Sequence, residues 1–223
     1  MPEKCAYIRA VGGISGDMLL GALIDVEADI DFITQQLNSL NLGEIELEFY
    51  NGIRKGVSGI GLRPLKGCLE SKSYTFRQFI KIIEDSQLTP NVRSKVLMTF
   101  ANLFQAEQKV HGTGDVELHE LGSIDTIIDI VGVVSGFESL ELDRIFCSAL
   151  PTGHGFIKSG HGLMPVPVPA VLELIKTSNA QLLTHSDQSY ESVEMITPTG
   201  VALAQTLAEF SDPIWKVRKT GVG

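Results

Sequence analysis

The stretch AYIRAVGGISGDMLLGALIDV, residues 6–26, joins a short apolar run, a glycine-rich turn and an apolar-periodic segment. Residues 6–10 predict a buried strand, and residues 12–16 predict a turn. From Asp17 onward, apolar residues recur every three or four positions, which is typical of a helix with one buried face. This strand–turn–helix unit indicates an α/β protein, a class in which ligands bind at the ends of strands.

Strands and helices interleave along the rest of the chain. We expect helices over residues 30–40, 74–85, 90–111, 123–140, 168–176 and 198–210. We expect strands over residues 44–49, in a second antiparallel run ending near 65, over 144–149 and over 214–217. Asp29, Thr89 and Ser123 stand at N-cap positions. The fold class is therefore α/β, a mixed sheet with helices packed on it, whose strand order the pattern does not give.

Composition excludes several classes of protein. Hydrophobic residues make up 43% of the 223 residues, so the chain can build a core. With 18 Lys+Arg against 27 Asp+Glu, the net charge of −9 argues against a nucleic-acid partner. The three cysteines form no CxxC pair, so neither a zinc knuckle nor a disulfide framework is indicated. Without a signal-like or membrane-spanning run, we expect a cytoplasmic protein with no membrane partner.

The glycine turn is a candidate anion site because successive N–H groups at a helix start can hold a phosphate. Gly13, Ser15, Gly16 and Asp17 are the candidate phosphate-binding residues. Asp17 would repel a bare phosphate unless a cation lies between them. The turn matches neither GxxxxGK[ST] nor GxGxxG. The alternative is a tight turn with Asp17 as an ordinary first-turn acid.

A second candidate site is HELGSIDTIIDI, residues 119–130. Asp125 and Asp129 are four residues apart and share one face of the expected helix. Asp129 interrupts an apolar run, so it needs a partner or a cleft. His119 and Glu120 precede the helix, and a cation held among these four candidate metal ligands would relieve the repulsion between the two aspartates. Alternatively, Asp125 is a first-turn acid and Asp129 faces water.

A third candidate is PTGHGFIKSGHGLMPVPVP, residues 151–169, in which Gly-His-Gly occurs twice, seven residues apart. If residues 158–160 form a hairpin tip, His154 and His161 lie in one small region. Neutral imidazole suits nickel, copper, zinc or iron. The alternative is a pair of unrelated surface histidines.

Together these segments resemble the LarC family of nickel insertion proteins. The matching blocks follow the family order: residues 13–23, 119–125 with 129–132, 155–156, 161–162 with 164–167, and 197–200. The resemblance implies a nickel chelatase of the lyase class. Such a protein inserts nickel, with CTP, into pyridinium-3,5-bisthiocarboxylic acid mononucleotide, and the completed cofactor holds the metal through two sulfurs and a ring carbon. The resemblance also adds Thr197 and Thr199 as candidate substrate-binding residues, although the Thr-Pro pattern by itself favours a role as the N-terminal cap of a helix.

The resemblance further implies a lactate racemase-type apo-enzyme as recipient, and we expect a homo-oligomer. It places CTP, with Mg or Mn, in a C-terminal domain beyond Gly223, so residues 1–223 would be the N-terminal portion, with a sub-boundary near 66–75. Two segments depart from the family pattern. Residues 9–11 replace an Asp-Cys-Phe-like run, and residues 68–73 replace a histidine-rich loop.

Two rival functions stay open: a non-catalytic metal-binding or assembly module, and a nucleotide-dependent transferase using the glycine turn. No catalytic residue is assigned. For nickel insertion we expect His119, Asp125 or Asp129, and His161 to converge on one cleft with the glycine turn at its edge. The side chains of His161 and Asp129 should then lie within about 15 Å of each other, because ligands of a shared ion lie ~2 Å from it.

Overall fold

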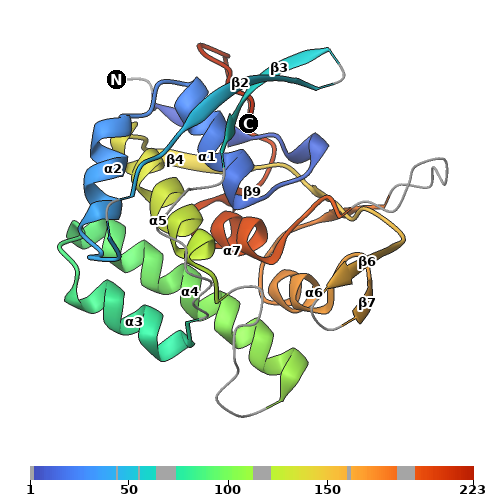
Figure 1. Cartoon of the computed structure of the whole chain (residues 1–223). Helices are drawn as coiled ribbons and strands as arrows, with labels where there is room; N and C mark the ends of the chain where they lie inside the picture. The colour runs from blue at the N-terminus through green and yellow to red at the C-terminus, as the bar shows by residue number, and fades with distance from the viewer. Residues whose placement is uncertain are drawn as a thin grey trace.

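The computed structural model describes residues 3–43, 45–54, 56–63, 74–112, 122–159, 162–184 and 194–223. The helices are α1 (Gly16–Asp25), α2 (Ile30–Asn38), α3 (Phe76–Asp85), α4 (Pro90–His111), α5 (Ile124–Ser139), α6 (Pro169–Lys176), α7 (Pro198–Leu207) and the 3-10 helix η1 (Ala10–Gly12). The strands are β1 (Cys5–Ile8), β2 (Phe49–Arg54), β3 (Val57–Leu62), β4 (Arg144–Cys147), β5 (Leu150–Pro151), β6 (Phe156–Ser159), β7 (Gly162–Pro165), β8 (Leu182–Leu183) and β9 (Glu209–Phe210). The α/β class is confirmed (Figure 1).

The strands form several small sheets, both parallel and antiparallel. A three-stranded parallel sheet has the order β1-β4-β9, and β5 pairs in parallel with β8. The pairs β2–β3 and β6–β7 are antiparallel hairpins. In the second hairpin, Lys158 pairs with Leu163 and Ser159 pairs with Gly162, so residues 158 and 159, which we expected at the tip, belong to strand β6.

The parallel sheet places the two glycine-containing segments at one edge. Because β1 and β4 are parallel neighbours, their carboxyl ends lie side by side. The N–H of Ser148 donates to the carbonyl of Ile8 at 3.0 Å, and the N–H of Ala10 donates to Ser148 Oγ at 3.1 Å. The glycine turn follows β1, and the chain after β4 leads through β5 to the first Gly-His-Gly segment. Both segments therefore begin from neighbouring carboxyl ends of the parallel sheet.

Helix α5 occupies the centre of the molecule and packs against α1, α2, α4 and α7 (Figure 1). Its residues from Ile130 to Phe137 are all buried. A helix that is apolar on every side has no face for water, which explains why the sequence directs this one into the core. The central position of α5 determines where the helices packed against it lie, including the start of α1.

Two expected strands differ from the structure. The first strand ends at Ile8 and gives way to η1. In the second, burial does alternate from Ile45 onward, but strand pairing starts only at Phe49. The period-two pattern there reports which side chains face the core, whereas pairing depends on a neighbouring strand that the pattern does not specify.

The end of the described chain also differs from expectation. Residues 214–217 form no strand, and the helix that starts at Pro198 ends at Leu207, before β9. Instead, Trp215 lies against Tyr7 of β1, with ring centroids 5.3 Å apart, and Tyr7 donates a hydrogen bond of 2.5 Å to Asp212. Side-chain contacts therefore hold this segment on the sheet edge.

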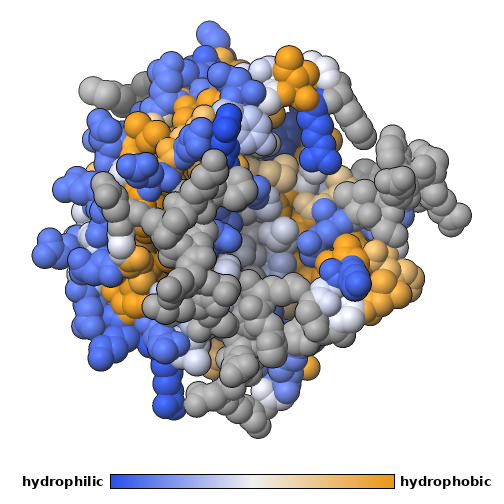
Figure 2. All heavy atoms as spheres, in the orientation of Figure 1, coloured by the Kyte–Doolittle hydropathy of each residue, from blue (hydrophilic) through white to orange (hydrophobic). Residues whose placement is uncertain are grey.

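Figure 2 shows an apolar patch over the hairpin β6–β7, where Phe156 is 57% and Leu163 is 72% exposed. The same view shows a recess between this hairpin and the hairpin β2–β3. Among the described residues, no helix combines the length and apolar character needed to cross a membrane.

Candidate functional site

The starts of α1 and α7 are bonded to each other at the sheet edge. The N–H of Ile14 donates to the carbonyl of Met195 at 2.8 Å, and the N–H of Thr197 donates to the carbonyl of Ile14 at 3.0 Å. Thr197 caps α7 by accepting from the N–H of Gly200 at 3.1 Å. Two helix N-termini, each with a partial positive charge, therefore lie together.

Several hydrogen-bond donors of the turn are already used within the fold. The N–H of Gly13 donates to the carbonyl of Ala10 at 3.1 Å, and the N–H of Ile14 is bonded to the segment before α7. Ser15 accepts from the N–H of Met18 and donates its hydroxyl hydrogen to the Asp17 carboxylate. The N–H groups of Ser15, Gly16 and Asp17 have no acceptor among the described residues. An anion bound here would find these three backbone donors.

Helix α5 meets the turn at Asp129. A β-carbon at Gly16 would overlap the Asp129 carboxyl group and would lie 2.5 Å from its Cβ. Only glycine allows α1 and α5 to approach this closely. Gly16, which the sequence suggested as a phosphate contact, thus also makes room for the Asp129 side chain, which lies more than a hundred residues away in the sequence.

The environment of Asp129 disfavours its charged form. The side chain is half-buried and has no hydrogen-bond donor among the described residues. Its burial, and then the charges of Asp17 and Asp125, raise the pKa of Asp129 from 3.8 to about 8. Asp17 and Asp125 are themselves exposed. A cation among the three carboxylates would reverse this effect, because it would stabilise the ionised form.

The remaining candidates are only partly placed. His119, Glu120 and His161 lie outside the described residues, so their convergence with Asp129 stays a prediction. His154 is half-buried on the segment after β5. Within the described part of the chain, no group of three or more His, Cys, Asp or Glu side chains is arranged to hold a metal ion. The described carboxylates therefore supply at most part of a metal-ligand set.

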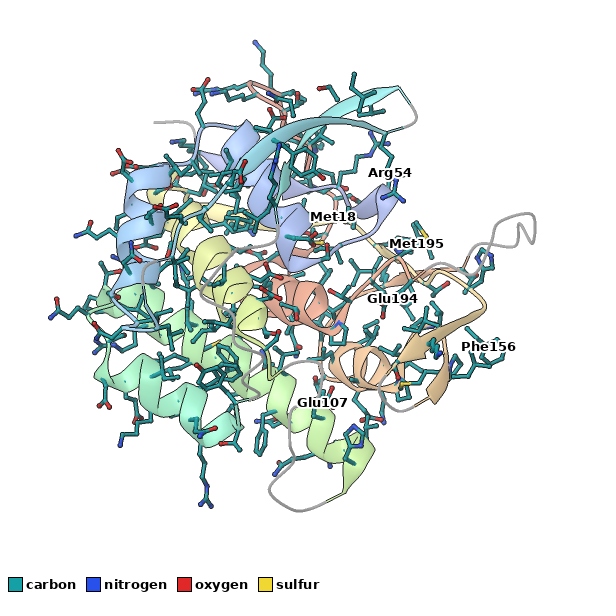
Figure 3. All side chains as sticks on the ribbon, viewed as in Figure 1. Met18, Arg54, Glu107, Phe156, Glu194 and Met195 are labelled. Carbon is teal, nitrogen blue, oxygen red and sulfur yellow. The ribbon has the colours of Figure 1, made fainter. Side chains whose placement is uncertain are left out.

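Thr199 is 6% exposed in the first turn of α7, so its side chain faces the interior. The sequence did not identify Met195 as a site residue, yet its carbonyl accepts the hydrogen bond from Ile14 that holds the glycine turn. Any residue type can make such a backbone contact, so the sequence cannot reveal it. Figure 3 shows Met18, Glu194 and Met195 on one face of the molecule, coming from α1 and from the segment before α7.

These observations define an α/β protein in which two helix N-termini lie beside the acidic side chains of Asp17, Asp125 and Asp129. The family description "Nickel insertion protein" matches residues 6–223, so the chain belongs to the nickel insertion protein family. The resemblance drawn from the motifs is thereby confirmed.

Relatives named pyridinium-3,5-bisthiocarboxylic acid mononucleotide nickel insertion protein occur in Desulfitobacterium hafniense and Staphylococcus saprophyticus. The first is 38% identical over 99% of this chain and 54% of its own length, and the second is 36% identical over 97% and 54%. A protein of Dictyoglomus thermophilum named putative nickel insertion protein is 32% identical over 99% of this chain and 56% of its own length. The chain thus spans about half the length of the curated relatives it matches. No solved structure matches it.

Proposed function

We propose that this chain handles nickel and the mononucleotide substrate in the insertion of nickel into pyridinium-3,5-bisthiocarboxylic acid mononucleotide. Support comes from the names of its relatives and from one structural observation. The Asp129 carboxyl lies against the backbone of Gly16, beside Asp17 and Asp125, without a described donor. A divalent cation is the natural partner for such a cluster.

The ligand chemistry fits a delivery role. The protein's candidate donors are the carboxylates of Asp125, Asp129 and Glu120 and the imidazoles of His119, His154 and His161. The substrate offers two thiocarboxylate groups, and soft sulfur donors bind nickel more strongly than carboxylate oxygens do. Nickel held by the protein's oxygen and nitrogen atoms can therefore pass to the substrate. The glycine turn, with Gly13, Ser15, Gly16, Asp17 and the neighbouring Thr197 and Thr199, is proposed to face the nucleotide.

Several features belong to this proposal at the level of the whole protein. They are the use of CTP with Mg or Mn, transfer of the finished cofactor to a lactate racemase-type apo-enzyme, homo-oligomer formation and a place in the cytoplasm. They follow from the family resemblance, and the curated relatives are about twice as long as this chain.

Nickel titration calorimetry tests the proposal. We expect the chain to bind Ni²⁺, and to bind it more tightly at pH 7.5 than at pH 5.5, because histidine and carboxyl ligands must lose their protons. Asp129→Asn should weaken binding by about tenfold or more, since the variant loses a charged ligand. Asp31→Asn, in the exposed first turn of α2, is the matched control and should bind as the parent does. Equal affinity of the parent and Asp129→Asn would contradict the proposal.

The hydrogen bonds of the turn weigh against a nucleotide-dependent transferase. Among the described residues of the turn, only the three N–H groups of Ser15, Gly16 and Asp17 remain for a phosphate chain, and no lysine follows the turn. We therefore expect no CTP hydrolysis by this chain with Mn²⁺ or Mg²⁺. Robust turnover in a phosphate-release assay would favour the transferase instead.

A further inference from the structure

The hairpin β2–β3 is clamped onto α1, the helix that begins at the glycine turn (Figure 1). The carbonyl of Ile60 lies so close to Gly21 that a β-carbon at Gly21 would overlap it. The N–H of Ile60 donates to the carbonyl of Val222 at 2.8 Å, and the N–H of Val222 donates to Asp25 Oδ2 at 2.9 Å. Val222 thus contacts both the hairpin and the helix and links one to the other.

The strand register shows which way Arg54 is directed. Arg54 pairs with Val57 and Gly52 pairs with Gly59, so these four residues share one face of the hairpin. A β-carbon at Gly59 would lie 2.9 Å from Val222 Cγ1, so the Val222 side chain lies on this side of β3. Figure 3 shows the Arg54 side chain extending from the end of β2 toward the part of the molecule where Met18 and Met195 lie.

Arg54 is a free cation, unlike the other described arginine of the hairpin region. It is exposed and has no ion-pair or hydrogen-bond partner among the described residues. Arg63 is committed instead, because its Nε lies 3.3 Å from Glu48 Oε1 and its guanidinium carbon lies 5.7 Å from the centre of the Tyr50 ring. Arg63 therefore stabilises the hairpin locally, whereas the guanidinium of Arg54 is available to bind a ligand.

The site needs such a cation if its substrate is the one proposed. The three groups that interact beside the turn, Asp17, Asp125 and Asp129, are acids, whereas the substrate carries a phosphate and two thiocarboxylates. Bound nickel offsets the charge of the thiocarboxylates but not that of the phosphate. Among its described donors, the turn itself contributes only the unpaired N–H groups of Ser15, Gly16 and Asp17. A guanidinium can add two parallel hydrogen bonds to phosphate oxygens together with its charge.

We propose that Arg54 is the phosphate-recognition residue of the mononucleotide site, an inference that rests on the proposed function. The hairpin β2–β3 then acts as an arm that holds the guanidinium over the start of α1, and the phosphate lies between Arg54 and the glycine turn. Arg54 touches neither nickel nor the reacting ring; it selects the phosphorylated substrate.

Two soluble pyridinium probes that differ only in the phosphate test this role: nicotinic acid mononucleotide and nicotinic acid riboside. Binding to the full 223-residue chain is measured by calorimetry. We expect the parent to prefer the mononucleotide. Arg54→Gln should weaken mononucleotide binding roughly ten- to a hundredfold and leave riboside binding unchanged, because it removes a charge-assisted hydrogen bond. Arg54→Lys should restore part of the preference.

Arg63→Gln is the matched control on the same hairpin, and it should keep the parent's preference. The proposal is overturned if Arg54→Gln retains the preference, if it weakens both probes equally, or if the parent shows no preference. Nickel titration of Arg54→Gln separates this idea from the proposed function. Parental nickel affinity is expected in the variant, whereas absence of nickel binding in the parent itself would defeat the proposed function. A parental melting temperature shows that each variant is folded.

Discussion

Two carboxyl groups in this fold have opposite surroundings. Glu209 of β9 is exposed and accepts two hydrogen bonds from Arg144, with Nε–Oε1 at 3.0 Å and Nη2–Oε2 at 2.6 Å. These bonds and the arginine's charge lower the pKa of Glu209. Asp129 of α5 is half-buried beside two other acids, and its pKa is raised to about 8.

The charged form of Glu209 stabilises the fold, whereas the charged form of Asp129 destabilises it. The Arg144–Glu209 pair fastens β9 to β4, two strands that share only the pairs Phe146–Glu209 and Cys147–Phe210. Asp129 fastens nothing that the structure describes. Acids with a strongly perturbed pKa cluster at functional sites, and the unfavourable half-buried position of Asp129 in the central helix is one reason why we propose it as a ligand.

The largest expected effect tests whether Asp129 is held in place by contact with the turn. Gly16→Ala forces α1 and α5 apart, and we expect a loss of about 3 kcal/mol in the free energy of unfolding. Urea denaturation measures this loss. Gly12→Ala is the matched control in the same segment, because a β-carbon at Gly12 meets nothing within 4 Å. Equal stability of the two variants would mean that the Gly16–Asp129 contact is not tight.

Asp129→Asn should make the protein more stable. At pH 8 we expect a gain of about 2 kcal/mol in the free energy of unfolding, because the amide cannot ionise in this half-buried position. This figure is smaller than the full pKa shift implies, since the side chain keeps some contact with water. Urea denaturation measures the gain. Loss of stability would show that Asp129 is structural, as Glu209 is, and would remove the contrast between them.

The gain should depend on pH in one direction only. The pKa of Asp129 is about 8 when folded and 3.8 for the ordinary group, so the folded state binds the proton more tightly. Its favourable contribution is complete below pH 4 and declines as pH rises toward 8. The stability difference between Asp129→Asn and the parent should therefore be near zero at pH 4 and largest near pH 8. A difference that stayed flat across this range would rule out a raised pKa.

Glu209→Gln should give the smallest effect, with the opposite sign. The variant loses its ion pair with Arg144, so it should be slightly less stable than the parent at neutral pH. Because both groups are exposed, the loss should shrink further in 1 M NaCl. Chemical denaturation at low and high salt measures both values. A large loss that salt does not change would show that the pair is more than a surface contact.

Local chemistry made parts of the fold predictable. Asp29 was expected to cap α2, and it accepts hydrogen bonds of 3.0 Å from the N–H groups of Asp31 and Phe32. Thr89 was also expected to cap a helix, but its hydroxyl has no hydrogen-bond partner among the described residues, and its N–H donates instead to Gln36 Oε1 at 2.9 Å. The Asp29 cap depends only on residues close to it in sequence. The hydrogen bond of Thr89 depends on Gln36 of another helix, so local sequence patterns cannot predict it.

The site shows the same limit. The interruption of an apolar run identified Asp129 as unusual, and the glycine turn was found from its composition. Their contact depends on how α1 crosses α5, and the order β1-β4-β9 depends on pairings between distant segments. The sequence alone did not identify Arg54 as a candidate binding residue. A single arginine at the end of a strand becomes a candidate only when the structure shows which helix its hairpin packs against.

The contact between Trp215 and Tyr7 gives the protein an optical reporter. Trp215 is the chain's only tryptophan, and it is half exposed on the ring of an edge-strand tyrosine rather than inside the core. Its emission will therefore follow detachment of residues 211–217 from β1, while circular dichroism follows the helices around α5. If the segment lifts before the core melts, the two signals will change at different denaturant concentrations without any added dye.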